Sequence, residues 1–344
     1  MSRGVPLRRV VVAGGRLVIA TIAGTAASSA GAQSSAGFQL RVDNDGFDFW
    51  ERPAQRPDGE YTNGVRMAIE LRRAPLWRRL ASHAPPCASV VETAPRCSSA
   101  LIVIGQDMYT PAEDSQPYTY PGWRRQRPYG GWLFGDMTLR VLRRSTAREF
   151  GLALGVTGPP SLAERAQRRA HELMRRYTSI PVGWETQVRF EPGVILRARQ
   201  RWLLFSGRVH RVRLIDAVVG AGASAGNILT SAEASADLRA GINLSHPWRR
   251  ARRRGPFELV GTIGVRGQAV ARNIFLDGNT FHPDRRVKRV PAVGDVRGSV
   301  GIRMGPLVLA YAVTERSREY TTGPRSHTYG SLIMGVGGIP DPTP

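Results

Sequence analysis

The stretch GPFELVGTIGVRG, residues 255–267, alternates apolar and polar side chains along its length. In an extended chain the two sets fall on opposite faces: Phe257, Leu259, Ile263 and Val265 against Glu258, Thr262 and Arg266. Successive side chains of a β-strand point to opposite faces, whereas a helix repeats about every 3.6 residues. The stretch therefore predicts a strand with one apolar face.

The same alternation recurs through most of the chain. We find about twelve such segments, which begin near residues 37, 60, 99, 131, 147, 183, 201, 233, 256, 292, 306 and 326. Past the N-terminus no apolar run reaches the roughly 18 residues that a transmembrane helix needs. This pattern predicts an all-β fold, a twelve-stranded antiparallel transmembrane β-barrel. A soluble exported β-sandwich or barrel is the alternative.

Residues 1–32 have the features of a secretory signal peptide. Arg3, Arg8 and Arg9 precede a run of small and apolar residues, and residues 30–32 read Ala-Gly-Ala, an A-x-A cleavage site. We therefore expect a signal peptide over 1–32 and one exported barrel domain over 33–344. In an exported protein we expect Cys87 and Cys97 to form a disulfide rather than a metal site.

Basic residues greatly outnumber acidic ones. Lys and Arg total 49 against 27 Asp and Glu, which gives a formal net charge of +22. Such an excess favours an anionic partner, either nucleic acid or an anionic lipid surface, unless it only reflects a coding bias toward Arg. The predicted export signal argues against nucleic acid.

Acidic and amide residues gather in RVDNDGFDFW, residues 41–50. Asn44, Asp45 and Asp48 offer the oxygen ligands that Ca²⁺ prefers, although the spacing is not that of an EF-hand loop. The alternative is a turn in which these side chains bond their own backbone. The residues alone leave both interpretations open.

One segment has helical character, SLAERAQRRAHELMRRY, residues 161–177. Ser161 and Glu164 have the spacing of a capping box at its start. Gln167, His171 and Met174 share one face of this helix. His171 is thus a candidate catalytic base, and a solvated histidine is the alternative.

Three further stretches combine aromatic residues, glycine and polar residues near strand ends: YTNG (61–64), IGQDMYTP (104–111) and RPYGGWLFGDM (127–137). The pair Asn63-Gly64 fits a hairpin turn, or a strand in which Gly64 admits a close neighbour. An aromatic girdle at the membrane interface would explain Tyr109, Tyr129 and Trp132.

In this order, NDGF, YTNG, IGQDMYTP, RPYGGWL, GVTGPPSL…Q…H, GW…Q…EP and DGNTF resemble the outer-membrane lipid A 3′-O-deacylase family. The resemblance extends from about residue 38 to about residue 335. It implies a monomeric barrel in the bacterial outer membrane, with one short helix near the active site. It also implies Ca²⁺-dependent hydrolysis of the 3′-linked acyloxyacyl ester of lipid A in lipopolysaccharide.

Carried over by position, the resemblance implies catalytic roles for His171, Asn44 and Thr62. It implies that Asp45 and Asn44 hold the Ca²⁺ ion, and it leaves Asp43 and Asp48 as solvated or turn residues. Where the family has an Asp before R-P-Y this chain has Gln126, which puts the salt bridge of that Asp in doubt. A further Lys and Tyr of the family have no clear counterpart here.

Two other functions stay open from the sequence. A barrel of this kind can act as a pore or a structural protein without catalysis. A Ser-dependent outer-membrane phospholipase is the other alternative, because GASAG, residues 222–226, matches G-x-S-x-G with Ser224 at its centre. A nucleophile elbow requires a strand, a sharp turn and a helix, and no helix is predicted after Ser224.

Overall fold

The computed structural model describes residues 36–47, 59–71, 84–87, 95–111, 122–173, 182–210, 212–248 and 257–336. The predicted signal peptide over 1–32, Asp48 and Met174 lie outside these ranges. The signal peptide therefore stays a prediction.

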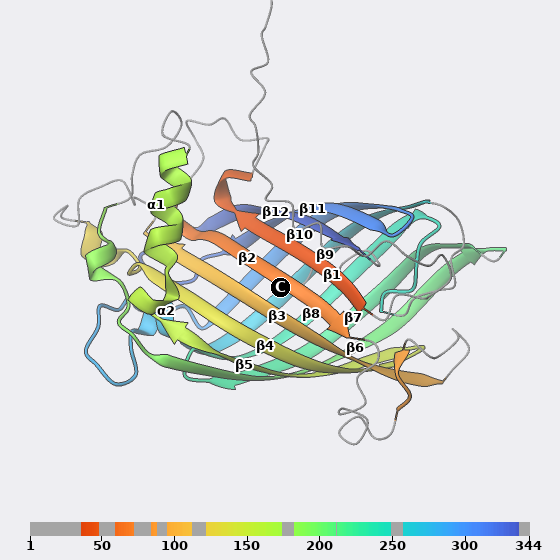
Figure 1. Cartoon of the computed structure of the whole chain (residues 1–344), viewed down its shortest axis with the longest axis horizontal. Coiled ribbons are helices and arrows are strands. Elements are labelled where there is room, and N and C mark those ends of the chain that lie inside the picture. The colour runs from red at the N-terminus through yellow and green to blue at the C-terminus, as the bar shows by residue number, and fades with distance from the viewer. Residues whose placement is uncertain are drawn as a thin grey trace, which may run out of the picture. The chain divides into compact units, whose positions relative to one another are not determined.

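Twelve antiparallel strands form a closed barrel in which each strand pairs with its sequence neighbours and β1 pairs with β12 (Figure 1). The strands are β1 (Ala36–Asn44), β2 (Glu60–Leu71), β3 (Arg96–Thr110), β4 (Gly130–Arg143), β5 (Thr146–Thr157), β6 (Pro192–Val209), β7 (Val212–Gly226), β8 (Leu229–Ile242), β9 (Phe257–Asn273), β10 (Ala292–Met304), β11 (Leu307–Ser317) and β12 (Ser326–Val336). The predicted fold class is confirmed.

Three of the predicted strand starts are wrong, those near residues 183, 201 and 233. The strands begin instead at Pro192, Val212 and Leu229. Residues 184–186 form a 3-10 turn, and β6 continues unbroken past residue 201 for 18 residues in all. The prediction placed two strands here, because this one strand is long enough to contain two stretches of alternation.

The apolar face of the strands points out of the barrel. In β9, Ile263 and Val265 are 68% and 52% exposed, whereas Glu258 and Thr262 are buried on the lumen side. An outward apolar surface around a polar interior is the distribution of a transmembrane barrel. Within the part of the chain that the structure describes, no helix has the length and apolar character to cross a membrane.

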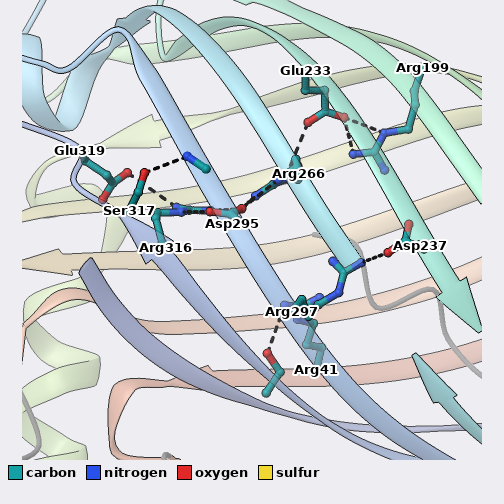
Figure 2. Close-up of polar contacts among 12 residues, drawn as sticks. Arg41, Arg199, Glu233, Asp237, Arg266, Asp295, Arg297, Arg316, Ser317 and Glu319 are labelled. Carbon is teal, nitrogen blue, oxygen red and sulfur yellow. Dashed lines mark hydrogen bonds and ion pairs between the residues drawn. The ribbon is translucent and has the colours of Figure 1, made fainter. Parts of the chain in front are cut away.

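Ion pairs on the lumen side of the wall link neighbouring and next-but-one strands (Figure 2). One series runs from Arg199 through Glu233, Arg266 and Asp295 to Arg316, with Arg199–Glu233 at 2.5 Å and Asp295–Arg316 at 2.8 Å. Charges in a barrel interior are costly unless they are paired. The carboxylates on the lumen side therefore compensate the buried arginines and link neighbouring strands of the barrel.

We call the end of the barrel where β1 leads to β2 the loop end; all its connections except that from β7 to β8 are longer than a tight turn. At the opposite end tight turns join β4 to β5, β6 to β7 and β10 to β11, and longer connections join β2 to β3 and β8 to β9. Outer-membrane barrels have short periplasmic turns and longer extracellular loops, so the loop end is extracellular. Both helices, α1 (Ala163–Leu173) and α2 (Ile274–Asp277), lie at this end (Figure 1).

An apolar layer fills the lumen at the loop end. Trp132 stacks on Phe134 with ring centroids 5.7 Å apart, and Phe275 of α2 stacks on Tyr109 at 4.4 Å. Tyr129 packs against Trp184 instead. The predicted interfacial girdle is therefore wrong for Tyr109, Tyr129 and Trp132, which face the barrel interior or pack beneath α1.

Two local predictions can be checked directly. Cys87 and Cys97 form the predicted disulfide, at the start of β3. The predicted capping box is wrong, because α1 begins at Ala163 and Ser161 belongs to the 3-10 turn before it. The Ser161 hydroxyl donates to the carbonyl of Gly158 (2.6 Å), and Glu164 pairs with Arg168 (3.0 Å).

Candidate active site on the outer face of the barrel wall

Asn44 and Thr62 lie together where β1 and β2 reach the loop end. The Asn44 amide donates to the Thr62 carbonyl (3.0 Å), and its oxygen accepts from the Gly46 backbone N–H (2.8 Å). Side chains of β1 alternate, and Phe38 is exposed on the outer face. Asn44, an even number of residues along the same strand, is therefore also on the outer face.

Asp45 opens a 3-10 turn, Asp45–Phe47, directly after β1. Its buried carboxylate accepts from the backbone N–H of Gly46 and from that of Gly59, both at 2.9 Å. The carboxylate thus joins the two ends of the connection between β1 and β2. These contacts fix the position of its oxygens beside Asn44.

Thr62 occupies a β-bulge in β2. The register with β3 shifts between Tyr61 and Asn63, and the Thr62 hydroxyl lies 2.5 Å from that of Thr110. Bulges re-aim a side chain and are frequent near active sites. The YTNG run is thus strand rather than hairpin turn, and Gly64 does admit a close neighbour, because a Cβ there would lie 1.9 Å from the Tyr61 hydroxyl.

Asp43 is neither solvated nor part of a turn, so that expectation is wrong. It is buried on the lumen side, where it accepts from Arg41 Nε (2.6 Å), Arg66 Nη1 (2.8 Å) and the Tyr61 hydroxyl (2.8 Å). The sequence already indicated the lumen side, because Asp43 falls on the same face of the strand as the polar Arg41 and on the opposite face from the apolar Val42.

Helix α1 starts against the outer face of β3 and β4. Ala163 is buried with Met108, and the Gln106 amide donates to the Ser161 carbonyl (2.6 Å). On β3, Ile102 and Ile104 are exposed to the outside, so Gln106 and Met108 are on that face too. A Cβ at Gly131 would lie 2.4 Å from that of Ala163, which explains the glycine in RPYGG.

His171 lies on the face of α1 that is turned away from solvent. Ala163, Gln167 and His171 are all buried, and they follow one another at intervals of four residues. The Gln167 side chain accepts from Trp184 Nε1 (2.7 Å), which fixes the middle of the helix. With a rise of about 1.5 Å per residue, His171 lies about 12 Å along the helix from Ala163.

The donor set at the loop end suits a hard cation. Asp45 and Asn44 offer carboxylate and amide oxygens on a turn whose backbone is held in place, and Ca²⁺ binds such oxygens. These residues fit the ion that the resemblance implies.

A second group of metal-ligand types lies within the barrel at the loop end. Ligand atoms of Glu60, Glu319 and His327 lie within 4.8 Å of one another, all buried. Arg127 Nη1 already donates to both carboxylates, at 3.1 Å and 3.0 Å. The guanidinium supplies the positive charge that a metal ion would otherwise bring.

Ser224 lies within β7, opposite Ser231 of β8. The chain is extended on both sides of it, so the strand, turn and helix of a nucleophile elbow are not formed there. Ser224 is thus not placed as a nucleophile.

Comparison with known proteins identifies the barrel. The family model described as outer membrane protein LpxR matches residues 16–337. Among solved structures, LpxR from Salmonella typhimurium aligns with a TM-score of 0.69 at 17% identity, over 88% of this chain and 100% of that one. The β domain of the Bordetella autotransporter BrkA aligns with a TM-score of 0.40 at 10% identity, over 88% and 97% of the two chains. No curated protein sequence matches the chain. Because the family model covers most of its length, the chain belongs to the LpxR family of bacterial outer membrane proteins.

Proposed function

We propose that this barrel is a lipid A 3′-O-deacylase, a Ca²⁺-dependent esterase that releases the 3′-linked acyloxyacyl group in the outer leaflet. The observation that carries the proposal is that the candidate residues of β1 and β2 and the start of α1 lie on the same, outer side of the barrel wall. Asn44 on the outer face of β1 donates to the Thr62 carbonyl of β2, and α1, which carries the buried His171, begins against the outer face of β3 and β4. Membership of the LpxR family supports the same activity.

The surroundings of the site suit a lipid substrate. Below it, the outer face of β2 and β3 carries Met67, Ile69 and Ile104, which are 48%, 44% and 57% exposed. Acyl chains can lie on this apolar surface while the ester reaches the polar residues at the loop end. A site on the outer wall is open to the membrane, as an enzyme acting on a membrane lipid requires.

The chemistry follows from the side chains present. Imidazole is the side chain that most often takes a proton near neutral pH, so His171 accepts the proton of the attacking water. The Asn44 amide and the Thr62 hydroxyl orient the ester carbonyl as donors. Asp45 and Asn44 would hold the Ca²⁺ ion, which when bound would supply electrostatic stabilisation of the negative charge on the carbonyl oxygen.

Two observations favour this function over the alternatives. A pore is disfavoured by the apolar layer in the lumen at the loop end. A Ser-dependent phospholipase is disfavoured because Ser224 lies within the strand β7, with no helix after it in the described residues 212–248.

Mass spectrometry of lipid A from cells that express the chain tests the proposal. We expect loss of the 3′ acyloxyacyl mass with the wild type, and intact lipid A with His171→Ala, with Asp45→Ala and with chelator. Ser224→Ala is the control and should act as the wild type does. Circular dichroism of each variant would show that the barrel is still folded. Activity in His171→Ala combined with its loss in Ser224→Ala would contradict the assignment.

A further inference from the structure

Behind the candidate site, on the lumen side of the wall, polar side chains from three neighbouring strands are joined. Asp43 of β1 accepts from Tyr61 and Arg66 of β2, and Arg66 Nη2 donates to Asp107 of β3 at 2.6 Å. The Tyr61 hydroxyl also lies 3.3 Å from Asp107. We call Asp43, Tyr61, Arg66 and Asp107 the Asp43 cluster.

The strands β1 and β2 each carry part of the Asp43 cluster on one face and part of the candidate site on the other. Asp43 directly precedes Asn44, and Tyr61 directly precedes Thr62. Side chains of adjacent strand residues point to opposite sides, so a contact that holds Asp43 also sets the direction of Asn44. The bulge at Thr62 makes this coupling stronger, because the backbone there lacks regular pairing to fix it.

The lack of a side chain at Gly64 makes room for the contact between Tyr61 and Asp43. A Cβ at Gly64 would lie 1.9 Å from the Tyr61 hydroxyl and 3.2 Å from Asp107 Oδ1. The absence of a side chain lets the phenol lie across the bulge and reach the carboxylate. In YTNG, Tyr61 and Gly64 thus act on the lumen side, and Thr62 on the outer side.

We propose that Asp43 and Tyr61 are positioning residues, which hold the bulge of β2 so that Asn44 and Thr62 meet the substrate on the other side of the wall. This inference rests on the proposed function. A displacement of about 1 Å at reacting groups can cost about 100-fold in rate, so loss of the Tyr61 hydroxyl lowers kcat while the lipid surface that sets KM stays intact.

The lumen offers a matched control for Asp43. Asp295 is also a buried carboxylate that pairs with two arginines, Arg266 and Arg316, on its neighbouring strands β9 and β11 (Figure 2). It lies on β10, which is not one of the three strands behind the site. Asp295→Asn therefore removes an equivalent charge without touching the bulge.

The test measures kcat and KM for lipid A hydrolysis and the Ca²⁺ concentration that gives half-maximal activity, with the purified variants in detergent micelles. Tyr61→Phe keeps every charge and should fold. It should lower kcat by about 10-fold or more, leave KM within about 2-fold, and raise the required Ca²⁺ concentration several-fold. Asp43→Asn should do the same, whereas Asp295→Asn should lose thermal stability but keep kcat per folded molecule and the Ca²⁺ requirement.

Two results would overturn the positioning role alone. In the first, the wild type is active and Tyr61→Phe has the same kcat and the same Ca²⁺ requirement as the wild type. In the second, Asp295→Asn loses as much kcat as Tyr61→Phe does. A folded wild-type protein that leaves lipid A intact would instead overturn the proposed function, and the positioning role with it.

Discussion

Arg127 is the residue whose loss should cost this barrel the most at the loop end. It is fully buried, its guanidinium donates to Glu60 and Glu319, and it lies 4.6 Å over the ring of Tyr109. Removing one partner of a buried ion pair costs about 3–5 kcal/mol, because the remaining charges are left without compensation. Arg127→Met keeps much of the volume and leaves two buried carboxylates close together. We expect its free energy of unfolding to fall by about 3–5 kcal/mol.

The same variant should gain a response to metal. Glu60, Glu319 and His327 bring ligand atoms within 4.8 Å, and carboxylate and imidazole groups are ligands of Zn²⁺. Without the guanidinium these three can bind the ion, and Zn²⁺ at 100 times its Kd would restore about 2.7 kcal/mol.

Urea unfolding in detergent micelles, followed by tryptophan fluorescence with and without Zn²⁺, measures both effects. The control is Arg199→Met, which breaks a half-buried pair with Glu233 and should lose less stability and ignore Zn²⁺. Wild-type stability in Arg127→Met, or equal stabilisation of the wild type by Zn²⁺, would refute the reasoning.

Two further predictions concern the lumen and the loop end. The wild type should show no steady conductance in a planar lipid bilayer, because Trp132, Phe134 and Phe275 belong to an apolar layer across the lumen, and porin-sized currents would contradict this. Burial alone would raise the pKa of Glu319, but the charges of Arg127 and Arg316 outweigh it and hold the pKa below its ordinary value of 4.5. The ionised carboxylate therefore stabilises the fold at neutral pH, and this contribution is lost as the pH falls below about 4.5 and through the lowered pKa. In Glu319→Gln the free energy of unfolding should depend less on pH below about 4, and an unchanged acid profile would count against the ion pairs.

Alternation, together with the predicted export signal and the lack of an apolar run long enough to span a membrane as a helix, predicted the barrel, because a period of two separates a lipid face from a lumen face in each strand. The alternation also indicates which aromatic residues point into the barrel. Tyr109 shares its alternation with Asp107, and Trp132 with Asp136, so both aromatic residues belong to the polar, inward set. Aromatic character suggested the membrane interface, but the position of a side chain in the alternation decides its face.

Other features depend on contacts that no single stretch of sequence contains. The bulge at Thr62 is visible only in the pairing of β2 with β3. The link between Gln167 and Trp184 joins a helix to a turn 17 residues away. Such contacts follow from the closed barrel and from the packing of α1 on its wall, so local patterns do not predict them.

The arrangement also resolves the contrast between a basic chain and its clustered acids. On the lumen side, carboxylates such as Glu149, Glu233 and Asp295 are each paired with arginine, so the lumen has little charge to offer a partner. On the exposed face of α1, by contrast, Arg165 and Arg169 form no ion pair with any described residue. These two arginines therefore place positive charge on the helix that carries the proposed base, at the loop end. There they would meet the phosphate groups of the anionic outer-leaflet lipid that we propose as the substrate.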